Sequence, residues 1–197
     1  MFRPTASRLV RRLVPAAAAL LLAAPALPRA QTPSLVPAAR ASDSALLTCA
    51  ARTAPDHPIT LTPAVTTLTR TIHARATLQL SDCRATTRAG RQLRSATVQI
   101  DARVRADCSR VTPLTGKATV TWRNGSGRRV GTSTVQAVRR THDSANVADG
   151  LLAGKVTRGP MAGTEVSGSL IPTSSITHCA DKGLRTLAGS GKVSLHR

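Results

Sequence analysis

The sequence of 197 residues contains few aromatic and few acidic side chains. It has one tryptophan, one phenylalanine and no tyrosine, and its 28 Lys and Arg residues outnumber nine Asp and Glu, for a formal net charge of +19. Because aromatic rings for base stacking are missing, we expect no specific recognition of nucleic acid. No apolar run reaches the ~18 residues of a membrane-spanning helix, so we expect no membrane span.

Motifs for metal binding, nucleophilic catalysis and phosphate binding are also missing. The chain has no Cys-x-x-Cys, His-x-x-x-His or Gly-x-Ser-x-Gly, and the run Gly189–Lys192 lacks the first glycine and the final Ser or Thr of a P-loop. The adjacent pairs Asp56-His57 and His142-Asp143 would point to opposite faces of a strand, so neither is a ready catalytic dyad. We therefore expect no enzymatic activity, no metal and no cofactor.

The first 26 residues are typical of a secretory signal peptide. Four arginines within the first twelve residues precede a short apolar stretch, and small residues allow cleavage after Ala26, with Ala30 as the alternative. Removing residues 1–26 leaves 171 residues and lowers the net charge to +15. Residues 27–44 hold three prolines among small residues and are interpreted as a flexible leader. We expect a secreted protein that is extracellular or associated with the cell wall.

Alternation of apolar and polar residues dominates the chain from residue 45 onward. Residues 72–80 and 96–106 carry an aliphatic side chain at every second position, which predicts half-buried strands. Ala118, Val120 and Trp122 form a third inward row. We therefore expect Trp122 to be buried as the largest residue of the core.

Turn residues divide the rest of the chain into short segments. Asn124–Gly127 predicts a hairpin, and Gly159-Pro160 with Gly163 predicts a later turn. Further strands are expected at residues 152–157, 165–171 and 187–195. We predict that residues 45–197 form one all-β domain, an antiparallel sandwich or flattened barrel of about eight strands stapled by disulfides.

The four cysteines, Cys49, Cys83, Cys108 and Cys179, all follow the signal peptide. An even number of cysteines in an exported chain predicts disulfides, and four cysteines allow three pairings. Each aromatic side chain that the core lacks forgoes ~150–250 Å² of burial. Two cross-links of ~2–4 kcal/mol each would offset that loss.

The cysteines, the turn residues and the single tryptophan follow one another in an order that allows comparison with known proteins. Cys49 is followed by His57-Pro58-Ile59-Thr60-Leu61-Thr62-Pro63 and Cys83, and Cys108 is followed by Gly116–Trp122, Gly154–Gly163 and Cys179. Over residues 45–195 the chain resembles small four-cysteine secreted proteins of actinobacteria. The resemblance implies an exported all-β fold, and it implies no catalytic residue because such proteins have no assigned activity.

Cys108, Trp122 and Cys179 also resemble the Cys–Trp–Cys spacing of an immunoglobulin-like domain, although a threonine stands where the tyrosine corner would be. From this spacing we expect a disulfide between Cys108 and Cys179 that bridges two sheets beside Trp122. The other pair, Cys49 and Cys83, would close a local loop around the opening strands.

The excess of arginine predicts attraction of anions, since a strongly basic chain concentrates polyanions around itself. The alternative is that these arginines are ordinary hydrated surface residues that bind no ligand. Five candidate anion-binding arginines lie on the polar phases of the two clearest strands or next to the hairpin: Arg75, Arg103, Arg105, Arg128 and Arg129.

We predict an exported, non-enzymatic protein that interacts through its surface. The expected partners are anionic cell-wall polymers or an extracellular protein. The alternative is a proteinaceous inhibitor of extracellular hydrolases, because a small disulfide-bonded domain can present a rigid loop. A third hypothesis is an enzyme with an unrecognised site. A loop held by a disulfide would favour the inhibitor, clustered acids in a cleft would favour the enzyme, and a continuous arginine face would favour anion binding.

Overall fold

The computed structural model describes residues 44–138 and 149–197, which all belong to one compact unit, Ala39–Arg197. The expected signal peptide (residues 1–26) and residues 27–43 of the expected leader lie outside the described residues. The described residues form ten strands: β1 (Leu47–Thr53), β2 (Ile59–Val65), β3 (Arg70–Ala85), β4 (Ser95–Ala106), β5 (Val111–Arg123), β6 (Arg129–Gln136), β7 (Gly154–Arg158), β8 (Glu165–Pro172), β9 (Leu184–Leu187) and β10 (Gly189–His196). Three short 3-10 helices accompany them: η1 (Arg88–Gly90), η2 (Asp149–Leu152) and η3 (Thr177–Cys179). None of these helices is long or apolar enough to span a membrane.

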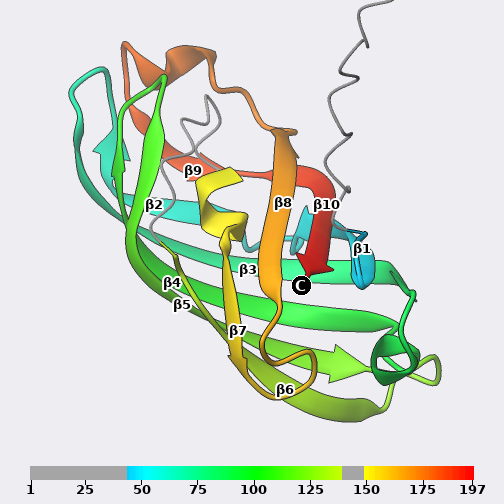
Figure 1. Ribbon diagram of the computed structural model, residues 1–197. Helices are drawn as coiled ribbons and strands as arrows, with labels where there is room; N and C mark the ends of the chain where they lie inside the picture. The colour runs from blue at the N-terminus through cyan, green and yellow to red at the C-terminus, as the bar shows by residue number, and fades with distance from the viewer. Residues whose placement is uncertain (1–43, 139–148) are drawn as a thin grey trace, which may run out of the picture. The chain divides into compact units, whose positions relative to one another are not determined.

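The strands close into an antiparallel barrel (Figure 1). Closure depends on β1, which hydrogen-bonds to β10 on one edge and to the second half of β3 on the other. The ring then runs from β10 through β8, β7, β6, β5 and β4 back to β3. The predicted all-β fold of about eight strands is therefore confirmed as a barrel. The immunoglobulin-like arrangement is wrong, since continuous hydrogen bonding leaves no pair of separate sheets.

Two additional strands extend the barrel at one end. β2 pairs with the first half of β3, and β9 pairs with β2. Residues 187–195, expected as one strand, belong to two: β9 ends at Leu187 and β10 begins at Gly189. Between them the backbone of Ala188 bonds to Thr173 and Ser174. At this point the chain leaves the extension and enters the barrel wall, which explains the break.

The long strands follow the predicted alternation. Residues 72–80 of β3 and 96–106 of β4 bury every second side chain, and the two strands pair in register along this stretch. β5 pairs with β4 so that Trp122 lies opposite Ala96. Period-two sequences pack this way because successive side chains of a strand point to opposite faces.

Trp122 is only 2% exposed and is the largest fully buried side chain, as predicted. Its indole Nε1 donates a hydrogen bond of 2.8 Å to Ser133 Oγ, and that hydroxyl donates one of 2.6 Å to the carbonyl of Pro160. Gly131 lies opposite Trp122, and a Cβ there would come 2.7 Å from the Pro160 ring. Glycine is therefore required at position 131, because any side chain there would keep the turn that contains Pro160 from packing against β6.

The disulfides join Cys49 to Cys83 and Cys108 to Cys179, so the predicted pairing is confirmed. The predicted location of the Cys108–Cys179 disulfide, beside Trp122, is wrong. Cys108 is the second residue after the end of β4, whereas Trp122 faces Ala96 near the start of that strand. At ~3.4 Å per residue, the stretch of β4 from Ala96 to its end separates the two by roughly 34 Å. The disulfide holds a cluster of loops at the extended end of the barrel.

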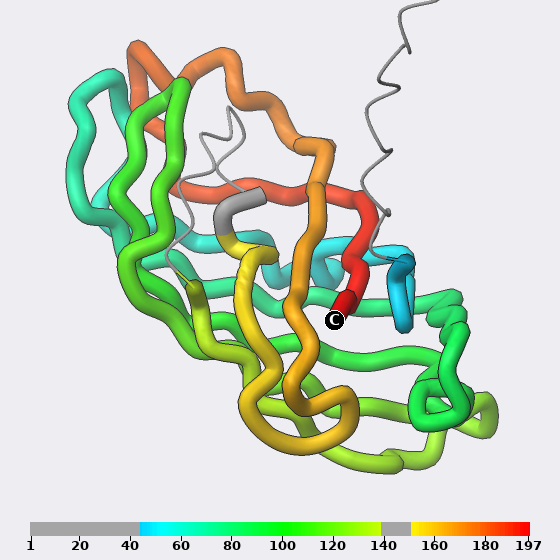
Figure 2. Tube along the Cα trace, viewed as in Figure 1, coloured from blue at the N-terminus to red at the C-terminus, as the bar shows by residue number. Residues whose placement is uncertain are grey.

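This cluster of loops comprises residues 66–69, 107–110 and 173–183, which lie side by side in Figure 2. The amide of Cys108 donates to the carbonyl of Thr66, and Gly183 packs against Ala64 and Thr66. Two of the three large, exposed apolar side chains among the described residues are here: Leu68 (74% exposed) and Ile176 (49%).

Asp107 ties two of these loops together. Its carboxylate accepts hydrogen bonds from Thr69 Oγ1 (2.6 Å), Ser109 Oγ (2.7 Å) and the amide of Ser109 (2.9 Å). The bond from Thr69, followed by those from Ser109, lowers the pKa of Asp107 from its usual 3.8 to about 2. A lowered folded-state pKa stabilises the fold fully above about pH 4, and the contribution is lost as the pH falls toward 2.

We expect Asp107→Asn to lower the thermal unfolding temperature at pH 7 and to flatten its decline between pH 4 and pH 2. The reason is that the amide retains less of the charge-assisted bonding and does not titrate. Thermal unfolding from pH 2 to pH 7 measures both effects. Asp56→Asn, in the exposed turn after β1 where φ is +60°, is the matched control. Parallel curves for wild type and Asp107→Asn would contradict this assignment.

Candidate functional site

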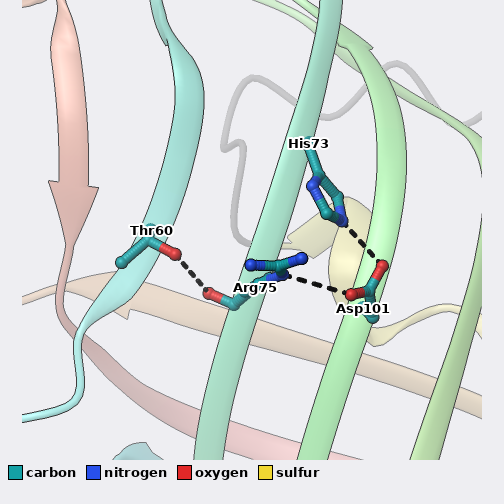
Figure 3. A network of polar contacts seen from close by, with 4 residues as sticks. All are labelled: Thr60, His73, Arg75 and Asp101. Atoms are coloured by element: carbon teal, nitrogen blue, oxygen red, sulfur yellow. Dashed lines mark hydrogen bonds and ion pairs between the residues drawn. The ribbon is translucent and has the colours of Figure 1, made fainter.

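Three of the predicted arginines lie on the outer face of β3 and β4. Arg75 is engaged there, because its Nε donates to Asp101 Oδ2 at 3.2 Å while His73 Nε2 lies 2.7 Å from Asp101 Oδ1. Figure 3 shows both β3 side chains pointing toward Asp101 on β4. The hydroxyl of Thr60 on β2 bonds to the backbone carbonyl of Arg75 and not to His73. The group is thus a surface ion-pair network.

The hydrogen bond from His73, with help from Arg75, lowers the pKa of Asp101 below its ordinary value. Asp101 is therefore a carboxylate at neutral pH, and its charge offsets that of Arg75. An open hollow of about 520 Å³ lies beside the network, with Asp56, Asp101, Arg75 and Lys117 among its lining residues. Mixed charges of this kind attract a polyanion only weakly.

Arg103 and Arg105 are exposed on the same face of β4. Arg103 stands between His73 and Thr115 of the flanking strands, and Arg105 stands between Thr71 and Thr112. No hydrogen bond or ion pair joins either guanidinium to another described residue. The two arginines add positive charge to the face that Asp101 partly neutralises.

Arg128 and Arg129 lie at the opposite end of the barrel, in the predicted hairpin between β5 and β6. Asn124 organises this turn: its side-chain oxygen accepts bonds from the amides of Ser126 and Arg128. Eight residues of β4 separate Arg103 from Ser95 at this end, or roughly 27 Å. The structure therefore does not bring the five predicted arginines together.

Sequence reasoning missed five further arginines at this end. Arg84 lies near the end of β3, three lie in the connection from β3 to β4 that contains η1, and one ends β5. With the two predicted arginines they form what we term the arginine end: Arg84, Arg88, Arg91, Arg94, Arg123, Arg128 and Arg129, all exposed. The density of arginine in residues 84–94 was the available signal. Figure 1 shows η1 beside the β5–β6 hairpin.

Three of these arginines are held next to one another by backbone pairing. Arg123 lies directly opposite Arg129, and the amide of Arg94 donates to the carbonyl of Arg123 at 2.9 Å. The side chain of Arg94 lies beside Gly125 at the tip of the turn. Like charges directly opposite in a sheet are destabilising, so this arrangement opposes the local stability of the hairpin.

Counter-charges are scarce at the arginine end. Asp82 stands next to Cys83, whose amide donates to the carbonyl of Arg94, but it forms no ion pair with a described arginine. Neither residues 84–94 nor residues 123–129 contain an acid, and no ion pair joins the seven arginines to another described residue. Arg123 donates to the carbonyl of Gly127 at 3.0 Å, and Arg129 donates to Thr132 Oγ1 at 2.6 Å. These bonds orient the two guanidinium groups and leave their other N–H donors available to a ligand.

Comparisons of the chain with protein-family models, with curated proteins and with solved structures find no match. No group of three or more His, Cys, Asp or Glu side chains suited to a metal ion occurs among residues 44–138 and 149–197.

Proposed function

We propose that the protein is an exported, non-enzymatic protein that holds anionic cell-wall polymers through the arginine end of its barrel. The observation that carries this proposal is the Arg123–Arg129 pair, with Arg94 beside it and no ion pair to any described carboxylate. Local arrangements that oppose stability are expected at functional sites. Two disulfides support an oxidising compartment outside the cytosol.

The chemistry favours phosphate groups as the ligand. A guanidinium presents a planar fork of donors that binds phosphate with two parallel hydrogen bonds, whereas an ammonium acts as a point charge. All seven basic residues of the arginine end are arginines. In the part of the chain that the structure describes, the one aromatic residue, Trp122, is buried, so no ring is available there for base stacking and recognition is confined to the charged backbone of the polymer.

Binding to long-chain inorganic polyphosphate at about 0.1 M salt tests the proposal. We expect Arg94, Arg123 and Arg129, all replaced by Gln, to weaken binding by about 100-fold, since three phosphate contacts are lost. The control replaces Arg103, Arg105 and Arg185, which are exposed elsewhere, and removes the same charge. It should weaken binding less than about threefold. Equal losses in both variants would show that net charge acts without a site.

The loop cluster supports the alternative, a proteinaceous inhibitor of extracellular hydrolases. Leu68 stands 74% exposed in the turn between β2 and β3, and the neighbouring Thr66 and Thr69 are bonded to Cys108 and Asp107. A rigid loop with one apolar anchor loses little entropy when it binds. If polyphosphate binding is absent in the wild-type protein, this loop becomes the better candidate.

A further inference from the structure

The barrel contains two adjoining hollows that are lined mainly by aliphatic side chains, and Thr115 and Lys117 also line the smaller one. One has a volume of about 50 Å³ and the other about 30 Å³. An eight-stranded barrel is just wide enough for side chains to fill or for one small ligand to enter. Here the wall supplies no Phe or Tyr, and alanines occupy inward positions such as Ala118. Spaces remain because these short side chains do not meet across the barrel.

The larger hollow has no polar group to offer. Its lining is aliphatic except for Trp122 and Ser133. The Ser133 hydroxyl already accepts from Trp122 and donates to the carbonyl of Pro160. Water in a cavity needs two to four polar partners, so a hollow of this composition stays dry. An apolar molecule loses no hydrogen bond on entering it.

Leu151 of η2 lies on the boundary between the hollows. It is one of five residues that line both: Ile100, Ala118, Val135, Leu151 and Ala153. Among these, Leu151 is the one large side chain that lies outside the strands of the wall. It is only partly buried, and η2 lies against β4, β5 and β8. The adjoining wall is the weakest of the barrel: β7 forms two residue pairs with β8 and three with β6. This side of the barrel opens most readily.

We propose that the barrel interior is a binding site for the end of a saturated alkyl chain, with Leu151 setting the length of chain that fits. A dry apolar cavity of about 150 Å³ takes up benzene or xenon. A hollow one third of that size accepts one or two carbons, and joining the two hollows by moving Leu151 extends the space. The site is independent of the arginine end.

Trp122 reports on this site directly, because it is the only tryptophan and lines the larger hollow. Bromoalkanes quench tryptophan emission on contact. We expect bromoethane to quench Trp122 in a saturable manner in the wild-type protein, and 1-bromobutane to bind at least tenfold more weakly. Leu151→Ala should bring 1-bromobutane to the affinity of bromoethane or better.

Two variants control the experiment. Leu184→Ala removes a partly buried leucine of β9 that lines neither hollow, and it should leave both ligands unchanged. Ala118→Leu fills the space and should reduce bromoethane affinity at least tenfold; Ala153→Val serves if Ala118→Leu fails to fold. If Leu151→Ala fails to fold, Leu151→Val takes its place, and it should raise the affinity for 1-bromobutane by a smaller factor. Quenching that rises linearly with ligand concentration, or that persists unchanged in the filled variant, would overturn the proposal.

Discussion

Replacing Trp122 by alanine should lower the free energy of unfolding by ~3–5 kcal/mol. Trp122 fills the barrel between Ala96 and Gly131, where neither neighbour can move in to replace it. The 50 Å³ hollow beside it would grow and not collapse, which places the loss at the upper end of this range. Urea denaturation followed by circular dichroism measures the loss without requiring tryptophan emission.

Trp122→Phe separates packing from hydrogen bonding. The ring retains most of the buried volume but leaves Ser133 without its indole donor. Ser133 still donates to Pro160, so no buried polar group is orphaned, and the expected loss is ~1–2 kcal/mol. A loss of less than 1 kcal/mol for Trp122→Ala would show that Trp122 is not a principal packing residue.

Removing the Cys108–Cys179 disulfide by replacing both cysteines with alanine should destabilise the fold by about 4 kcal/mol. The disulfide closes a loop of 71 residues, and in the chain-entropy model a cross-link of that span removes this much freedom from the unfolded chain. Removing Cys49–Cys83, with a separation of 34 residues, should cost about 0.6 kcal/mol less, since a doubled loop adds only that much.

Removing each of the two disulfides should also loosen a different part of the native protein. Cys49 and Cys83 lie in β1 and β3, which hydrogen-bond to each other, so the barrel wall keeps its amide protection without them. The middle of the loop 173–183 is joined covalently to the other loops of the cluster through Cys179. Hydrogen exchange should rise there only in the Cys108/Cys179 variant. Equal protection of this loop in both variants would contradict its dependence on the disulfide.

Periodicity made the central strands of the fold predictable. Residues 72–80 and 96–106 alternate without interruption, and Trp122 continues the same inward phase, so their burial follows from the sequence. Closure could not be predicted in this way. It depends on β1 pairing with both β10 and β3, and these partners lie far from β1 in the sequence. Alternation reports a strand's two faces and carries no information about its partner.

The candidate site was predictable only in part, for a related reason. Arg128 and Arg129 stood out because they adjoin a clear turn, whereas the arginines of residues 84–94 lie in a connection without periodicity. Arg75 and Asp101 are 26 positions apart in the sequence, and only the β3–β4 register shows that they meet. Net charge per segment indicates a basic surface, but the pairing of strands decides which charges remain unbalanced.

The salt dependence of polyphosphate binding tests the central claim most directly. The slope of log K against log salt concentration counts the phosphates that the protein neutralises, at about 0.7 per contact for a single strand. We predict that replacing Arg94, Arg123 and Arg129 by Gln reduces the magnitude of this slope by roughly two. The control variant at Arg103, Arg105 and Arg185 should leave it nearly unchanged. The same slope in the wild-type protein and both variants would contradict a binding site at the arginine end.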